Sequence, residues 1–179
     1  MMGQQLVKTT RHIAVIALLS ALYSILGAAS GLLVGPLLRG YPAHLFRGLT
    51  MSMTAAYSQR KWSTTLMGFI SGIIFLVIVP APAPYLLAAS LAAGLAYDAV
   101  IMVGGRYAES SRRRGRIVLG TVVSSVAEAV VALSILTYVG LFEVQAMVLT
   151  MIWLGAAAAN IVLSLGGASI TILLLRRFK

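Results

Sequence analysis

Long uncharged runs alternate along the chain with short segments that carry proline, glycine or arginine. About 20 predominantly apolar residues cross a bilayer as one helix, and proline interrupts a helix because it lacks a backbone N–H. The pattern therefore predicts an all-α integral membrane protein that forms one domain over residues 1–179. Six transmembrane helices are expected, at residues 12–34, 43–58, 63–79, 85–105, 117–139 and 146–175.

Proline-containing segments decide the number of helices. Residues 35–36 (Gly-Pro) and 40–42 (Gly-Tyr-Pro) separate the first predicted helix from a shorter second one that contains Arg47. Residues 80–84, Pro-Ala-Pro-Ala-Pro, divide an uncharged stretch into the third and fourth helices. The sixth predicted helix is longer than a bilayer requires, so it should tilt or project.

The basic residues predict the orientation. With six spans, one side of the membrane holds twelve of the 14 lysines and arginines: Lys8, Arg11, Arg60, Lys61, Arg106, Arg112, Arg113, Arg114, Arg116, Arg176, Arg177 and Lys179. The opposite side holds only Arg39. Basic residues are enriched in cytoplasmic loops, so both termini are expected in the cytoplasm of a cell whose plasma membrane contains the protein.

The composition excludes several classes of function. The 179 residues are 60% hydrophobic and 10% charged, with a mean hydropathy of +0.97, whereas soluble domains carry roughly 25% charged residues. The absence of cysteine excludes disulfides, thiolate metal sites and cysteine nucleophiles. Two histidines and four acids are scattered singly, so no catalytic residue, metal or cofactor is expected. The net charge of +10 lies in short clusters beside apolar runs, which is typical of loops facing anionic lipid and not of nucleic-acid binding.

Residues 1–31 have a rival interpretation as a cleaved signal peptide. Lys8 and Arg11 precede an apolar run that ends in small residues. Secretory apolar regions are only about 7–15 residues long, and five more predicted spans follow here, so a transmembrane helix is favoured.

Polar groups within the predicted spans are candidate functional residues, because charges are costly in hydrocarbon. Glu128 follows Arg116 by 12 positions, which places it roughly 18 Å from the cytoplasmic edge and in the outer half of the membrane. Other polar and aromatic residues at comparable depth could converge with it on one outward-facing pocket. The predicted substrate-binding residues are His44, Arg47, Tyr85, Glu128, Trp153 and Asn160.

Four of these six residues also have a structural interpretation. Arg47 and Glu128 could form a buried ion pair that locks two helices together. His44 could be an interfacial residue, and Trp153 could face lipid. Asp98 is expected to pair with Arg106 or to make a polar contact between helices, and not to touch a substrate.

Small residues recur at helical spacing in the first and sixth predicted helices. In the first helix, Ala17 and Ala21 form a small-xxx-small step, and in the sixth, residues 155–159 and 166–168 contain only glycine and alanine. Such residues let a second helix approach the backbone closely. The alternative is that they serve only packing within this chain.

The opening of the chain resembles a known family. Thr10-Arg11-His12 leads directly into Ile16-Ala17-Leu18-Leu19-Ser20-Ala21-Leu22-Tyr23, which is similar to the first helix of the substrate-binding S components of energy-coupling factor (ECF) transporters. The resemblance implies six spans and cytoplasmic termini. It implies that Ala17 and Ala21 dock on a transmembrane T component coupled to two cytoplasmic ATPases. A vitamin-like substrate would bind near the outer face, under a lid formed by residues 35–42.

Within that family, the chain looks most like the members that bind thiamine or its hydroxymethylpyrimidine precursor. The similar features are Gly-Pro before a Tyr-Pro loop, Ala55-Ala56-Tyr57 ahead of Arg60-Lys61, and Pro-Ala-Pro before the fourth helix. Riboflavin, biotin and a queuosine precursor stay open as substrates. The metal-binding start of the cobalt and nickel members is absent.

The expected function is therefore a binding subunit of an importer and not an enzyme, since partner subunits would hydrolyse ATP. An integral-membrane enzyme is disfavoured because Asp98 is the only aspartate and no His-Glu pair exists. A non-transporting six-helix scaffold or assembly factor is the main alternative.

Overall fold

The computed structural model describes residues 2–33, 41–79, 84–103, 105–140 and 144–177, and the side chains of α1 only over residues 10–30. The prediction of an all-helical chain is confirmed for these residues, which form seven helices and no strand. The helices are α1 (Met2–Leu33), α2 (Tyr41–Ser58), α3 (Ser63–Ile78), α4 (Pro84–Val103), α5 (Tyr107–Ser110), α6 (Arg114–Tyr138) and α7 (Ala146–Arg177).

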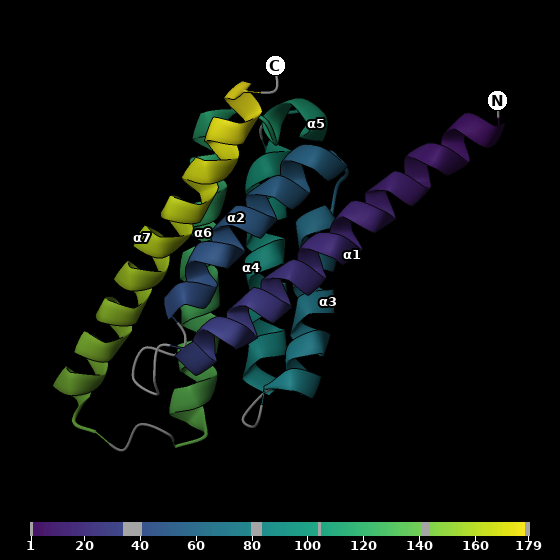
Figure 1. The fold of residues 1–179 in the computed structure, drawn as a ribbon. Coiled ribbons are helices and arrows are strands. Elements are labelled where there is room, and N and C mark those ends of the chain that lie inside the picture. Colours follow the sequence, from purple (N-terminus) through teal and green to yellow (C-terminus); the bar gives the residue numbers. More distant parts are fainter. Residues whose placement is uncertain (1, 34–40, 80–83, 104, 141–143, 178–179) are drawn as a thin grey trace.

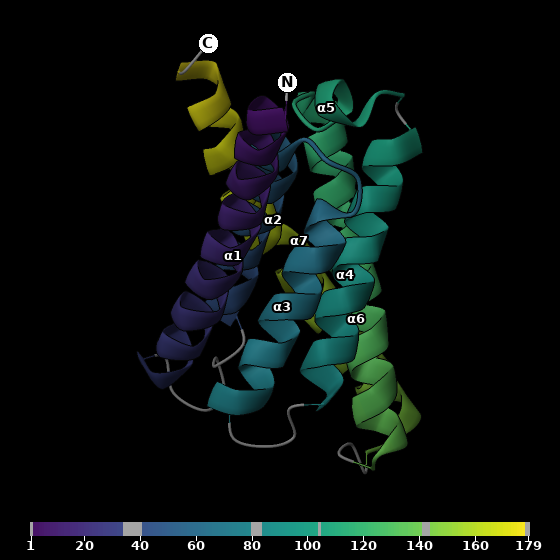
Figure 2. The same ribbon diagram turned by 90° about the vertical axis from the view of Figure 1, so that its right-hand side faces the viewer.

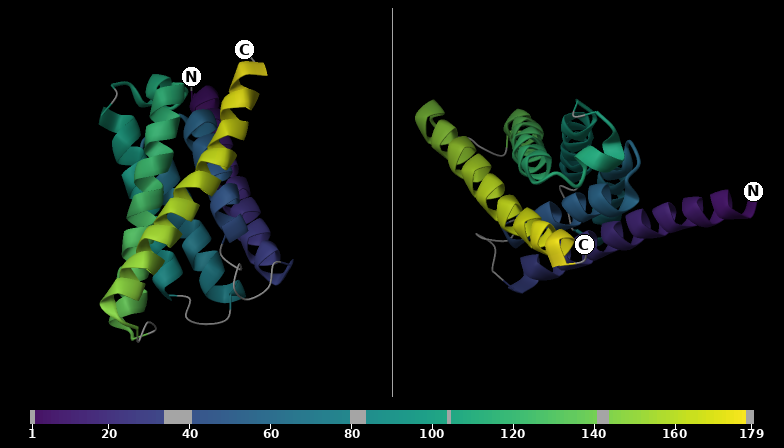
Figure 3. Two further views of the ribbon diagram at one scale, coloured as in Figure 1. Left: turned by 90° about the vertical axis from the view of Figure 1, so that its left-hand side faces the viewer. Right: turned by 90° about the horizontal axis from the view of Figure 1, so that it is seen from above.

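The six long helices pack as two layers of three (Figure 1, Figure 2). In one layer α3, α4 and α6 run nearly parallel, and in the other α1, α2 and α7 cross them obliquely, with α2 in the middle. Figure 3, in its view from above, shows the second layer as one row along the face of the first. The start of α1, the end of α7 and the short helix α5 lie at the same end of the bundle.

Two features differ from the sequence-based prediction by more than a few residues: the start of α1 and the additional helix α5. Helix α1 begins at Met2, ten positions before the predicted start, because no proline separates its polar first turns from the apolar run. Helix α5 lies inside the predicted basic loop, where its four residues are too few to show a hydrophobic period.

Four segments are long and apolar enough to cross a membrane: Thr10–Ser30, Pro84–Val103, Arg114–Tyr138 and Ala146–Arg177. Helix α3 is apolar but has only 16 residues. Helix α2 has 18 residues but is less apolar. Its position explains this composition, because polar residues such as Arg47, Thr50 and Ser52 are fully buried against other helices instead of facing the outside.

Helices α2 and α7 touch through their backbones. A side-chain carbon at Gly167 would overlap the carbonyl oxygen of Leu45, and one at Gly48 would overlap that of Ser164. The contact also contains a hydrogen bond between the hydroxyls of Ser52 and Thr171, at 2.7 Å. The small residues 166–168 of α7 therefore include a packing surface within this chain.

Candidate functional site

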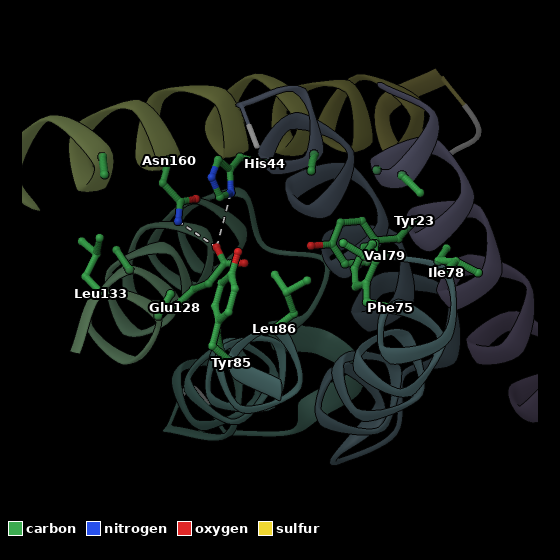
Figure 4. A pocket seen from close by; sticks show the side chains of 17 residues that line it. Tyr23, His44, Phe75, Ile78, Val79, Tyr85, Leu86, Glu128, Leu133 and Asn160 are labelled. Carbon is green, nitrogen blue, oxygen red and sulfur yellow. Dashed lines mark hydrogen bonds and ion pairs between the residues drawn. The ribbon is translucent and has the colours of Figure 1, made fainter. Parts of the chain in front are cut away.

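A cavity of about 390 Å³ lies between the two layers, in the half of the bundle where α1 and α3 end and α2 and α4 begin. All six long helices contribute to it (Figure 4). The lining residues are Tyr23, Gly27, Ala28, Ala43, His44, Phe75, Ile78, Val79, Tyr85, Leu86, Ala89, Glu128, Ala129, Ala132, Leu133, Ala156 and Asn160.

Glu128 of α6 is the polar centre of this cavity. Its Oε2 accepts a hydrogen bond from Asn160 Nδ2 at 2.7 Å, lies 3.4 Å from His44 Nδ1 and forms an ion pair with Arg47. In Figure 4 the side chains of His44 and Asn160 converge on this oxygen from the opposite layer. Its second carboxylate oxygen, Oε1, receives no hydrogen bond from the described residues, so it can accept one from a ligand.

Arg47 lies behind Glu128 and is not part of the cavity wall. Its guanidinium is fully buried and donates through Nη2 to Ser125 Oγ at 2.9 Å and to Ser164 Oγ at 2.8 Å, as well as to Asn160 Oδ1. A buried charge is tolerated only when it is paired and hydrogen-bonded. Arg47 of α2 therefore neutralises Glu128, and its hydrogen bonds link α2 to α6 and α7 around the carboxylate.

Much of the remaining wall is apolar or aromatic. Tyr23 of α1 and Phe75 of α3 pack edge to face with ring centroids 5.2 Å apart. Tyr85, Leu86 and small alanines complete the wall. A cavity with an apolar body and one polar corner suits a small ligand that is largely apolar and polar on one edge.

The structure brings together most of the predicted substrate-binding residues. His44, Tyr85, Glu128 and Asn160 line the cavity, and Arg47 contacts Glu128 from behind. The ion pair between Arg47 and Glu128 exists, and its acid also lines the cavity, so the binding of a substrate by Glu128 stays a prediction.

The expectation that Trp153 walls this cavity needs correction. Trp153 is half-buried but is not among the lining residues, and Ala156 is the nearest position of α7 that is. Helix α7 crosses its layer obliquely, so its first turns extend past the cavity toward the end of α6 (Figure 3). The predicted lid lies outside the described residues, apart from Tyr41 and Pro42, which begin α2.

Sequence analysis missed Tyr23 and Phe75 in the wall, and Ser125 and Ser164 beside Arg47. The two serines had a signal, because Ser125 lies three positions before Glu128 and Ser164 four after Asn160, on the same helix faces. The two aromatic residues had none, since both sit in long apolar runs.

The second buried carboxylate, Asp98 of α4, lies at the opposite end of the bundle and has a structural role. It accepts hydrogen bonds from the backbone and the hydroxyl of Thr65 at 2.8 and 2.7 Å, and from the hydroxyl of Tyr107. Of the two expectations for Asp98, the polar contact between helices holds. The pairing with Arg106 does not, because Arg106 reaches Glu109 instead, at 3.7 Å. Burial and the adjacent Asp98 carboxylate raise the pKa of Tyr107, so its hydroxyl stays protonated and ties α5 to α3 and α4.

The two alanines predicted to contact a partner lie on the outer side of α1. Ala17 is exposed and Ala21 is half-buried, while Ile16 and Tyr23 on the other side of the helix are buried. The alternative, packing within this chain, therefore does not account for Ala17.

Within the part of the chain that the structure describes, no group of three or more histidine or acidic residues could hold a metal ion. Comparison of the chain with protein-family models, with curated proteins and with solved structures gives no match.

Proposed function

We propose that this protein is a membrane-embedded substrate-binding subunit, of the S-component type, that captures a vitamin-like molecule for ATP-driven uptake by partner subunits. The observation that carries the proposal is the cavity around Glu128. It combines a volume within the range of small-molecule sites, roughly 300–1,000 Å³, with a wall of apolar and aromatic side chains. It also contains an acid whose Oε1 receives no hydrogen bond from the described residues.

The proposed topology is six spans with both termini in the cytoplasm. It is supported by the arrangement of charge, because the basic residues of the 106–116 segment and of the end of α7 lie at the end of the bundle away from the cavity. The positive-inside rule assigns that end to the cytoplasm. The cavity then belongs to the outer half of the membrane and receives its ligand from outside.

The chemistry of the cavity favours a planar heterocycle that donates a hydrogen bond. Glu128 Oε1 is the free acceptor, and Tyr23, Phe75 and Tyr85 supply aromatic surface for a ring. An aminopyrimidine, as in thiamine or its hydroxymethylpyrimidine precursor, has both properties and is our preferred substrate.

Partner binding is proposed for the outer side of α1. Ala17 is exposed beside Leu18, which is 69% exposed, so this strip is both small and apolar. Close backbone contact with a transmembrane T component would use such a strip, and that component would couple the subunit to two cytoplasmic ATPases.

The test is to purify the protein in detergent, identify small molecules that co-purify by mass spectrometry, and measure the melting temperature with hydroxymethylpyrimidine and with thiamine. A ligand that binds the folded state raises the melting temperature. Ala156→Leu, which fills the cavity, should abolish this rise, whereas Ala158→Leu on the exposed side of α7 should leave it intact.

The result that would overturn the proposal is clear. A panel of vitamins and precursors that leaves the melting temperature unchanged, in a preparation with no co-purifying molecule, would favour the six-helix scaffold instead.

A further inference from the structure

A second, smaller hollow lies at the end of the bundle away from the Glu128 cavity. It has a volume of about 140 Å³ and is lined by Arg112, Arg114 and Ile117 on one side and by Ile172, Leu175 and Arg176 of α7 on the other. Helices α6 and α7 diverge toward this end (Figure 3). Residues of both helices line the hollow. We call it the arginine wedge.

The three arginines of the wedge have no acidic partner among the described residues. Of the two acids at this end, Asp98 is hydrogen-bonded to Thr65 and Tyr107. Glu109 contacts Arg106 at 3.7 Å and Arg113 at 4.0 Å, and neither of these arginines lines the wedge. Arg112 also donates through Nε to the carbonyl oxygen of Ala56 of α2, at 3.4 Å. Three arginines that line one hollow repel one another unless an anion lies between them. Guanidinium groups bind phosphate oxygens in bidentate geometry, which makes a phosphate the anion of best fit.

The apolar half of the wedge shows which phosphate fits. Ile172 lies four positions before Arg176, so it is roughly 6 Å deeper along α7, in the direction of the apolar part of the helix. A free phosphate would make no favourable contact with the isoleucine and leucine side chains. A phospholipid would, because its acyl chains lie directly below its phosphate. Leu173, next to Ile172 in the sequence, is 60% exposed, so α7 also presents apolar surface outside the wedge at this level.

We propose that the arginine wedge binds one anionic phospholipid, with its phosphate between Arg112, Arg114 and Arg176 and an acyl chain against Ile172 and Leu175. The phosphate of the lipid offsets the repulsion between the three arginines where α6 and α7 diverge. Its acyl chain fills the apolar part of the wedge. This lipid is distinct from the transported ligand, because the two sites lie at opposite ends of the bundle.

The experiment uses the full-length protein in a neutral detergent, with native mass spectrometry to count bound lipid and to measure its affinity. Phosphatidylglycerol is the probe. Phosphatidylcholine with the same acyl chains, the deacylated glycerophosphoglycerol headgroup and inorganic phosphate are the comparison ligands. One phosphatidylglycerol should be retained per chain, while the zwitterionic lipid and the two ligands without acyl chains should bind at least roughly tenfold more weakly.

Two double variants remove the same amount of charge. Arg114→Gln with Arg176→Gln removes two of the three arginines of the wedge and should weaken phosphatidylglycerol binding roughly tenfold or more. Arg106→Gln with Arg113→Gln removes the arginines paired with Glu109 and should leave it unchanged. If the first double variant does not fold, Arg176→Gln alone serves, because that residue lies in the last turn of α7.

Equal weakening in both double variants would mean that only the general surface charge attracts the lipid, and it would overturn the proposal. Equal affinity for phosphatidylcholine would overturn it as well. Binding of inorganic phosphate or glycerophosphoglycerol as tightly as the lipid would show an anion site without a lipid role, which also contradicts it.

Discussion

Replacing Glu128 with glutamine removes one charge and keeps the shape of the side chain. In the structure this carboxylate does two things at once. Its Oε2 neutralises the buried Arg47 and accepts from Asn160, and its Oε1 faces the cavity without a partner from the described residues. Glu128→Gln should therefore lower both the stability of the ligand-free protein and its affinity for a ligand.

The expected loss of stability is moderate. Breaking a buried ion pair by removing one partner costs about 3–5 kcal/mol, because an uncompensated charge remains. Here Arg47 keeps neutral acceptors in Ser125, Asn160 and Ser164, and the new amide oxygen can accept as well. We therefore expect a loss of about 2–3 kcal/mol, or roughly 4–12 °C in melting temperature for a chain of this size.

The expected loss of affinity follows from the free oxygen. A hydrogen bond to a charged group contributes about 1.5–3 kcal/mol, so the dissociation constant should rise roughly ten- to hundred-fold. The assay is the melting temperature without ligand, together with the concentration of hydroxymethylpyrimidine or thiamine that gives half of the stabilisation.

Ser125→Ala is the matched control. It removes one acceptor from Arg47 on the side away from the cavity, so it should lower stability slightly and leave affinity unchanged. An affinity in Glu128→Gln equal to that of the unchanged protein would show that Glu128 is only a helix-packing residue. An unchanged melting temperature would contradict the argument about Arg47.

Three further predictions concern the surfaces and packing of the bundle. Ala17→Leu with Ala21→Leu should reduce recovery of a complex with a partner membrane subunit while ligand binding persists, since each leucine adds three heavy atoms to a close contact; unchanged recovery would remove α1 as the docking surface. A single cysteine at Glu109 should react with a membrane-impermeant reagent only in inside-out vesicles, and one between α6 and α7 only in intact cells; labelling of either from the wrong side would contradict six spans. Gly167→Ala should destabilise the protein by about 1–3 kcal/mol because its methyl overlaps the backbone of α2, whereas Gly166→Ala has room and should not, so equal melting temperatures would refute the contact.

The sequence predicts the helices well because the signals are local. Uncharged runs and proline breaks depend only on neighbouring residues, and the observed helix ends lie within a few positions of those expected, except at the start of α1. What the sequence lacks is the arrangement of the helices. Nothing in the sequence of residues 43–58 indicates that α2 is the central helix of its layer. That central position explains its polar residues, because they are buried against neighbouring helices.

The candidate site was predictable in part, because the sequence indicates how deep each residue lies in the membrane. Counting residues along the predicted helices placed Glu128 and Arg47 in the outer half of the membrane and Asn160 near its middle, and the structure joins all three. Counting gives height within the bundle but no lateral position. Trp153 was therefore expected at the cavity, although α7 lines it only from Ala156 onward. Phe75 was missed because an apolar run gives no reason to single out one ring.

The charge balance of the polar corner also limits what the cavity can bind. Arg47 and Glu128 neutralise one another, and Ser125, Ser164 and Asn160 add no charge. A cationic group placed against Glu128 would leave this buried cluster with a net positive charge, which is costly where water is excluded. A neutral N–H donor reaches the same oxygen without that penalty. The edge of the ligand that meets Glu128 should accordingly be an uncharged amine or amide of a ring, and any positive charge on the ligand should lie away from this corner, toward Tyr23 and Phe75, whose ring faces attract cations.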